Sequence, residues 1–207
     1  MIMSEKTIHL QEHADDEAKK LGMWLFIFTE LLLFGGLFLV YSVFRAQYPA
    51  NFHEGSLELS VTIGAINTIV LLVSSMTVAM ALTAIQKNNR KLAMILISVT
   101  LFLATVFLVN KVFEWGAKFE HGLYPGSKLM PMLERGDLLY FSLYFFMTGL
   151  HALHIIVGMV LLTICLFKVK SGNVNSHKYI HLENGALYWH LVDLIWIFLF
   201  PLMYLIT

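Results

Sequence analysis

The length of its apolar segments constrains this chain more than any other feature. Five of them are long enough for a helix to cross the hydrocarbon core of a bilayer, which takes roughly 20 residues. The apolar runs are continuous rather than alternating, a pattern typical of membrane helices and not of barrel strands. The sequence therefore predicts an all-α integral membrane bundle of five transmembrane helices, over about Leu21–Phe44, Leu57–Ile85, Leu92–Ala117, Leu138–Phe167 and Leu182–Thr207.

The composition agrees with this class and excludes several others. Of the 207 residues, 58% are hydrophobic and 14% are charged, whereas soluble domains are about 25% charged. Lys plus Arg and Asp plus Glu number 14 each, so the chain offers no basic stripe for nucleic acid. The single cysteine, Cys165, excludes an internal disulfide and a cluster of cysteine metal ligands.

The first twenty residues form a polar, acid-rich segment that is unlike a secretory signal or a transit peptide. We expect residues 1–20 to be a cytoplasmic tail and residues 21–207 to form one membrane domain. Three Lys lie in this tail, and three Lys or Arg lie in each of residues 87–91 and 168–178, whereas the two opposite loops hold four together. Because basic residues gather on the cytoplasmic side, the N-terminus is expected inside and the C-terminus outside.

Ionisable residues inside the spans are the candidates for function, because a charge at the centre of a membrane helix costs about 2.5–3.5 kcal/mol on insertion scales. Residue counts from the span ends, at about 1.5 Å each, place five of them in the inner half of the membrane. We expect these five to form a buried polar layer or a subunit interface: Glu30, His151, His154, His190 and Asp193. His151 and His154 are three residues apart and so share a helical face, as do His190 and Asp193.

Two further sets of residues accompany this layer. Small and polar residues on the second and fourth spans form a stripe typical of helix–helix packing: Asn67, Ser74, Ser75 and Gly158. Charged residues near the outer ends of the spans are expected to pair with one another or to reach the interface: Lys111, Glu114, Glu58 and Asp137.

Three interpretations of the polar layer remain open. Histidines can ligate haem or copper, but haem sites in bundles use opposed pairs, and His151 and His154 share one helix. A proton relay of Glu30, a histidine and Asp193 is the second interpretation. The third, which the residues favour, is that these groups hydrogen-bond one another and stabilise the bundle. The sequence has no phosphate loop or nucleophile elbow, so it predicts no catalytic, cofactor-binding or metal-binding residue.

Four stretches together carry the pattern of a known family. The first span contains LGMWLF, TE and FGGLF within residues 21–38, and the second contains NT, LL and SS within residues 67–75. The fourth span contains TGLHALH at residues 148–154, and the fifth contains WHLVDLIW at residues 189–196. With these stretches in this order, the chain resembles subunit III of the haem–copper oxidases, which include cytochrome c oxidase and the bo-type ubiquinol oxidases.

The resemblance implies a non-catalytic subunit III of a proton-pumping terminal oxidase in aerobic respiration, with cytochrome c oxidase favoured. It implies no cofactor in this chain, haem and copper in partner subunits, and bound phospholipid. The implied main contact is with subunit I, which subunit III stabilises and whose proton uptake it supports. Glu30 matches the family's buried carboxylate, and the three histidines and Asp193 match its recurrent polar residues.

The chain departs from the family pattern at two points. Seven-helix members carry two further N-terminal helices, so the chain is similar to the five-helix bacterial form, which implies a multi-pass protein of the bacterial plasma membrane. Ala152 stands where the family usually has glycine. Alternative hypotheses are subunit III of a quinol oxidase, an accessory protein of nitric-oxide reductase, and an independent small transporter, although no inverted repeat supports the last.

Overall fold

The computed structural model describes residues 5–176 and 178–206, with side chains from residue 17 onward. Every regular element in this part of the chain is a helix. The elements are α1 (Glu5–Gln47), α2 (Pro49–Leu57), α3 (Val61–Gln86), α4 (Arg90–Glu120), the 3₁₀ turn η1 (Met130–Met132), α5 (Arg135–Ser171) and α6 (Ile180–Tyr204).

Five of the described helices are long and apolar enough to cross a membrane, namely α3, α4, α5, α6 and the part of α1 from Glu17 onward. The shortest of them, α6, has 25 residues, and at about 1.5 Å per residue it exceeds the thickness of a hydrocarbon core of roughly 30 Å. The prediction of an all-α bundle with five membrane helices is confirmed.

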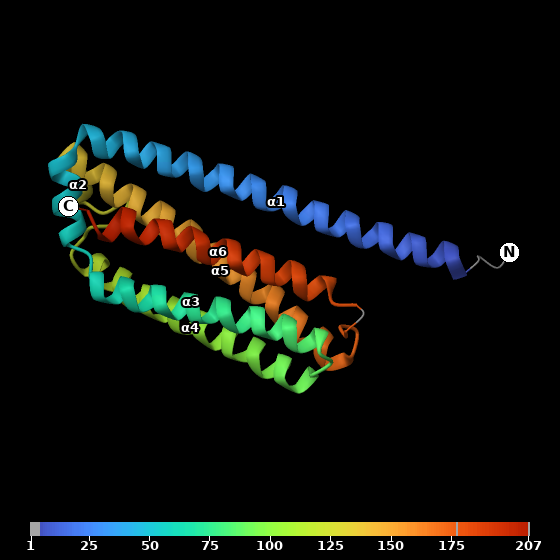
Figure 1. Ribbon diagram of the computed structural model, residues 1–207. Coiled ribbons are helices and arrows are strands. Elements are labelled where there is room, and N and C mark those ends of the chain that lie inside the picture. The colour runs from blue at the N-terminus through green and yellow to red at the C-terminus, as the bar shows by residue number, and fades with distance from the viewer. Residues whose placement is uncertain (1–4, 177, 207) are drawn as a thin grey trace.

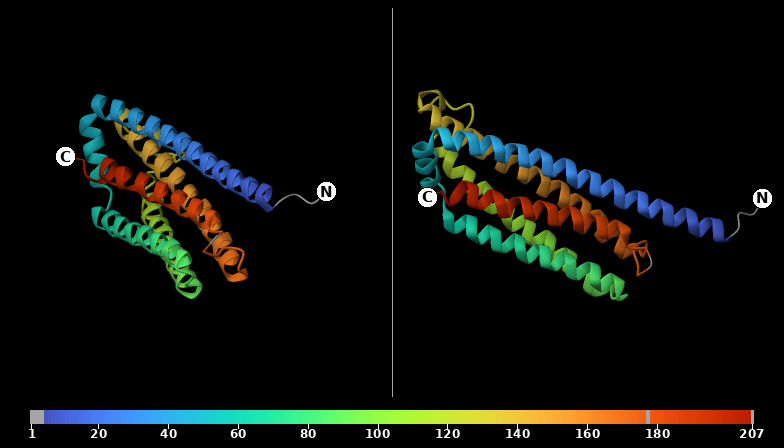
Figure 2. Two further views of the ribbon diagram at one scale, coloured as in Figure 1. Left: turned by 45° about the vertical axis from the view of Figure 1, so that its right-hand side comes forward. Right: turned by 45° about the horizontal axis from the view of Figure 1, so that its top comes forward.

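Four of these helices form a ring, and the fifth lies outside it. α3 packs against α4, α4 against α5, α5 against α6, and α6 against α3. α1 packs against α5 and α6 and runs along one side of the ring (Figures 1 and 2). The short helix α2 crosses the end of the bundle at which the C-terminus lies, hereafter the α2 end (Figure 1).

α1 contacts the ring through a narrow stripe of side chains. Ile27, Phe34 and Tyr41 are buried and follow one another at seven-residue intervals, the spacing of a helix that packs along one seam. Ile27 and Phe34 pack with Leu191 and Ile195 of α6. Only 6% of the most apolar stretch of α1 is buried, against 56% in α6. α1 is therefore the peripheral helix of the bundle, and α6 is the central one.

The backbone between α1 and α3 differs from the sequence expectation. The predicted second span begins at Leu57, whereas the structure ends α2 at that residue and begins α3 at Val61. Ser60 accounts for the break, because its hydroxyl accepts a hydrogen bond from the Ile63 amide and so caps a new helix. Pro49 occupies the first turn of α2, where a missing amide hydrogen costs nothing.

The other ends of the predicted spans also shift. α1 continues without a break through residue 20, where the polar tail was expected to end. The last predicted span runs to Thr207, which lies outside the described residues, and α6 ends at Tyr204. Hydropathy locates the apolar segment of a helix, but the helical backbone extends past it into polar residues.

Glycine allows two close helix contacts with α6. A Cβ on Gly64 of α3 would lie 2.6 Å from the Phe200 ring, and one on Gly158 of α5 would lie 2.8 Å from the Trp189 ring. Both distances are too short for carbon atoms, so only glycine permits these approaches. Gly158 thus packs against a neighbouring helix, as the small-residue stripe suggests.

Candidate functional site

The five residues of the expected polar layer do not form one continuous network. Glu30 of α1 joins His154 of α5, and His190 of α6 joins α3. His151 has no hydrogen-bond partner among the described residues, and Asp193 has only the Ser75 hydroxyl beside its carboxyl group, outside strict hydrogen-bond geometry. The structure therefore does not join Glu30 to Asp193 through a chain of hydrogen bonds.

The Glu30–His154 pair connects the peripheral helix to the ring. His154 Nε2 lies 3.0 Å from Glu30 Oε2, and both side chains are largely buried. His154 Nδ1 lies 2.8 Å from the Leu150 carbonyl oxygen, which can only accept, so Nδ1 carries a hydrogen. The contact between Nε2 and the carboxyl group then needs one further proton, on the imidazole or on the carboxyl. The pair can therefore hold a single proton that either partner can carry.

His190 makes the second helix-to-helix contact of this layer. Its Nδ1 lies 2.6 Å from the hydroxyl of Ser75 on α3. Asp193 is one turn further along α6 and is buried, and the same Ser75 hydroxyl lies beside its carboxyl group, although not in strict hydrogen-bond geometry. Burial without partners is costly for a polar group.

His151 is fully buried and packs against aromatic rings of two neighbouring helices. Its ring stacks on Trp196 of α6 with centroids 5.2 Å apart, and the edge of Phe107 of α4 meets it at 5.7 Å. His154, three residues later, faces α1 instead. The two histidines of α5 thus point to different neighbours. Across the residues that the structure describes, no three His, Cys, Asp or Glu side chains come close enough to hold a metal ion.

The small-residue stripe on α3 binds polar groups of the neighbouring helices. Asn67 accepts a hydrogen bond of 2.8 Å from the Asn110 side chain of α4. Ser74 accepts one of 3.0 Å from the Trp189 indole of α6. These bonds fix the rotation of α3 against both neighbours. Asn110 and Trp189 were not singled out as site residues, because periodicity along one helix does not identify the partner on another.

A closed network of four residues lies near the α2 end. The Lys111 ammonium group donates to Glu114 Oε2 at 3.3 Å, to the Tyr204 hydroxyl at 2.8 Å and to the Tyr144 hydroxyl at 3.3 Å. Both tyrosine hydroxyls donate to Glu114 Oε1, at 2.6 Å from Tyr144 and 2.5 Å from Tyr204. The Trp196 ring also faces the ammonium group, at 5.2 Å. All these side chains are buried, so the network links α4, α5 and α6 away from lipid.

The other two charged residues expected near the outer ends lie apart from this network. Glu58 is exposed in the turn after α2, where its carboxylate lies 3.4 Å from the Lys118 ammonium group. Lys118 also donates to the backbone carbonyl of Glu58. Asp137 lies in the first turn of α5, partly buried, and bonds to neither residue. Lys118 is a contributor that the sequence pattern did not reveal.

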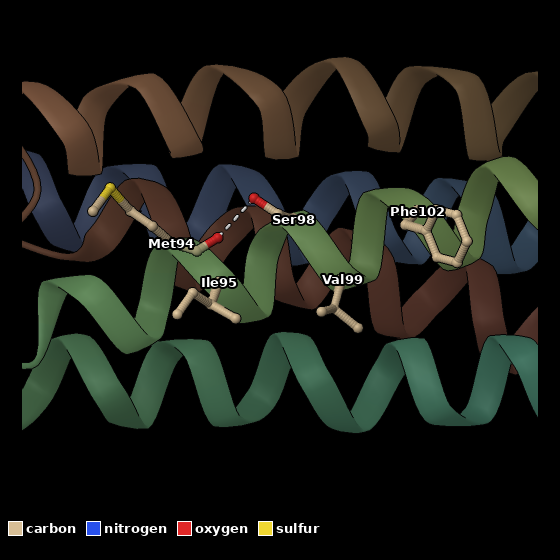
Figure 3. A pocket seen from close by; sticks show the side chains of 5 residues that line it. All are labelled: Met94, Ile95, Ser98, Val99 and Phe102. Atoms are coloured by element: carbon tan, nitrogen blue, oxygen red, sulfur yellow. Dashed lines mark hydrogen bonds between the residues drawn. The ribbon is translucent and has the colours of Figure 1, made fainter.

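Two concave surfaces differ in charge. A cavity of about 420 Å³ lies between α1, α5 and α6 at the end opposite α2. Its walls include apolar side chains such as Met23 and Leu161, and lysines Lys19 and Lys168 also line it. A shallow apolar hollow on the outer face of α4, lined by Met94, Ile95, Ser98, Val99 and Phe102, carries no charged residue (Figure 3).

Comparison with known proteins gives a consistent result. The sequence model of the family described as cytochrome c oxidase subunit III matches residues 2–207. Cytochrome c oxidase subunit 3 of Thermostichus vulcanus is 30% identical over 96% of this chain and 92% of its own length. The subunit 3 of Synechocystis is 29% identical over 94% of this chain and 78% of its own length.

A third relative joins two subunits in one polypeptide. The haem–copper oxidase subunit I+III of Aeropyrum pernix is 32% identical over 89% of this chain, which spans 22% of that longer protein. The match over the whole chain, five membrane helices and the order of the four sequence stretches all lead to one assignment. This chain belongs to the cytochrome c oxidase subunit III family.

Proposed function

We propose that the chain acts as the non-catalytic subunit III of a proton-pumping haem–copper terminal oxidase, most closely a cytochrome c oxidase, in a bacterial plasma membrane. The observation that carries this proposal is the family match across residues 2–207. Five helices of membrane-spanning length support a multi-pass location. The distribution of Lys and Arg supports a cytoplasmic N-terminus and an external C-terminus.

The partner that we propose is the catalytic subunit I, which this chain stabilises. The relative from Aeropyrum pernix, a haem–copper oxidase subunit I+III, joins the two subunits in one chain. Two subunits that occur fused in one relative are expected to be neighbours where they are separate. The other subunits of the respiratory oxidase and membrane lipids complete the proposed surroundings.

Haem and copper are assigned to the partner subunits. The two histidines of α5 do not fit haem ligation, because both ring nitrogens of His154 are engaged and His151 packs between Trp196 and Phe107. The Nδ1 nitrogen of His190 is hydrogen-bonded to the Ser75 hydroxyl. Its hydrogen-bond partner on the facing helix is therefore a serine and not a second histidine. Among the described residues, the histidines of the polar layer therefore supply no opposed pair of haem ligands.

Bound phospholipid and support of proton uptake are the remaining parts of the proposal. The cavity between α1, α5 and α6 combines apolar walls with Lys19 and Lys168, a combination that suits acyl chains beneath an anionic headgroup. The Glu30–His154 pair places a carboxyl group and an imidazole within hydrogen-bond distance between two helices of membrane-spanning length. We propose on this basis that the Glu30–His154 pair supports proton supply to the neighbouring subunit.

The test is purification through a C-terminal tag from native membranes, followed by a reduced-minus-oxidised spectrum and mass spectrometry of the chains that co-purify. We expect haem a together with subunits I and II. Haem b and haem o would identify a quinol oxidase instead. A colourless preparation with no partner chain would contradict the proposal and would make transport by the reconstituted chain the next test.

A further inference from the structure

One surface of the central helix is left uncovered between its neighbours. α6 packs against α1 on one flank and α3 on the other (Figures 1 and 2). Between those flanks, the side chains that α6 leaves exposed or half-buried recur every three or four residues. These side chains define the α6 face: His190, Leu194, Ile197, Phe198 and Pro201.

His190 is the one ionisable side chain of the α6 face, and half of its hydrogen-bonding capacity is unused. Nδ1 is engaged by the Ser75 hydroxyl at 2.6 Å. Within the described chain no group hydrogen-bonds Nε2, and the ring is only partly buried. Because a hydroxyl can donate or accept, Nε2 can in turn accept or donate. The α6 face thus presents one unpaired nitrogen among apolar side chains.

The position of His190 along α6 argues against a lipid headgroup as the partner of this nitrogen. His190 lies seven residues beyond Glu183, the charged residue in the first turn of α6, which corresponds to about 10 Å along the helix. At that depth the surrounding lipid is hydrocarbon, which offers no hydrogen bond and makes an unpaired polar atom costly. A partner for Nε2 must therefore come from another protein segment within the membrane.

The outer face of α4 shows what a lipid-facing surface of this protein looks like. Its polar group is the Ser98 hydroxyl, which donates to the Met94 carbonyl oxygen at 2.9 Å in the same helix (Figure 3). The neighbouring side chains, among them Ile95, Val99 and Phe102, are apolar and exposed. The face of α4 can lie against hydrocarbon without leaving a hydrogen bond unmade. The α6 face in the same surroundings would keep the unpaired Nε2 of His190.

We propose that a transmembrane helix of the catalytic subunit packs on the α6 face, between α1 and α3, and that a polar group of that helix hydrogen-bonds His190 Nε2. This inference rests on the proposed function, because the catalytic subunit is the partner named there. Packed helices lie about 8–10 Å apart, so a helix seated on α6 also contacts the flanking helices. Phe198, whose ring already meets Phe38 of α1 at 6.4 Å, lies beside such a helix.

Site-specific photocrosslinking in the intact complex tests this placement. A photoreactive phenylalanine analogue replaces Ile197 on the α6 face or Phe102 on the α4 face, two exposed apolar positions. Crosslinks are formed in native membranes and identified by mass spectrometry. The inference predicts a crosslink to the catalytic subunit from position 197 and none from position 102. A crosslink from 197 to a second copy of this chain, or no protein crosslink from 197, overturns it.

A second measurement addresses the hydrogen bond itself. His190→Leu removes Nε2, and His190→Gln keeps a polar group at that position. We expect dissociation of this chain from the complex to accelerate on the order of threefold to tenfold for His190→Leu and to be largely restored in His190→Gln. Ser98→Ala on the α4 face is the matched control and leaves the rate unchanged. Equal rates for His190→Leu and the wild type contradict the proposed bond.

The two proposals fail in distinguishable ways. Should the wild-type chain co-purify with no catalytic subunit, the proposed function is wrong. Should the catalytic subunit co-purify but crosslink only to position 102, the proposed function stands and the assignment of the α6 face is wrong.

Discussion

The buried polar groups of this bundle fall into two regions that differ in how completely their hydrogen bonds are formed. Near the α2 end, Lys111, Glu114 and two tyrosines satisfy one another in a closed network. In the middle of the bundle, His151 is as deeply buried, but neither of its ring nitrogens has a hydrogen-bond partner among the described residues, and Asp193 has only the Ser75 hydroxyl beside it. Burial alone therefore does not identify the residues that stabilise the chain.

The effect of a substitution depends on whether it leaves other buried polar groups without a hydrogen-bond partner. Removal of one member of a satisfied network leaves the other members buried and unpaired, which is costly. Removal of a group that has no partner leaves nothing unpaired. The first region should therefore be sensitive to substitution in the chain itself, and the second should be tolerant. Four predictions test this difference, in order of decreasing effect.

Glu114→Ala should have the largest effect. It removes the acceptor of both tyrosine hydroxyls and leaves the Lys111 ammonium group buried without its counter-charge. Loss of one partner of a buried ion pair costs about 3–5 kcal/mol. We expect a matching fall in the free energy of unfolding of the purified chain in detergent. Glu120→Ala, at the exposed end of α4, serves as the control.

A double variant refines the prediction for Glu114. Lys111→Met combined with Glu114→Leu replaces the buried ion pair by apolar side chains, which is often neutral or even stabilising. The double variant should therefore be more stable than Glu114→Ala. If it is less stable, the loss arises from packing or from the two tyrosine hydroxyls left without an acceptor, and not from an unpaired charge.

Glu30→Ala should have the next largest effect, concentrated on α1. It removes the bond to His154 Nε2, and an unsatisfied buried nitrogen costs about 1–3 kcal/mol. Because α1 has little other buried contact, we expect faster amide hydrogen exchange in α1 and unchanged exchange in α4. Glu30→Gln, which retains a hydrogen-bonding group, should be milder. A uniform increase in all helices would refute the proposed local role.

Tyr144→Phe should cost less, about 1 kcal/mol, the usual net value of one hydrogen bond. Glu114 keeps its bonds to Lys111 and Tyr204 in this variant. The measurement is again the unfolding free energy in detergent. Tyr124→Phe, in the loop before η1, is the matched control and should not change it. A loss as large as that of Glu114→Ala would mean that the network acts as a single unit.

His151→Phe should have the smallest effect, within about 1 kcal/mol of the wild type or slightly stabilising. Phenylalanine keeps a flat ring against Trp196 and Phe107 and removes two unpaired nitrogens. A loss of more than about 2 kcal/mol would show that His151 has a hydrogen-bond partner, such as a buried water, and that the two regions do not differ as described.

The sequence was sufficient to predict the fold class and the number of membrane-spanning helices, since hydropathy identifies a membrane span directly. It did not predict α2, because Pro49–Leu57 is short and mixed in polarity. The break after α2 depends on Ser60, whose capping role is a local hydrogen bond that the apolar pattern conceals. The limits of elements are therefore less predictable than their existence.

Within the candidate site, contacts along one helix were more predictable than contacts between helices. Lys111 and Glu114 are three residues apart, and the structure pairs them. Their partners Tyr144 and Tyr204 lie on other helices, which spacing cannot reveal. Spacing also suggests one shared face for His151 and His154, but helices meet α5 on several sides, so the two rings have different neighbours.

The most direct test of the whole account is a structure of the complex purified with this chain, with attention to what covers the α6 face. The account predicts a helix of the catalytic subunit between α1 and α3, with a polar group within hydrogen-bond distance of His190 Nε2. Lipid on the α6 face, with the catalytic subunit bound against α4, would contradict it.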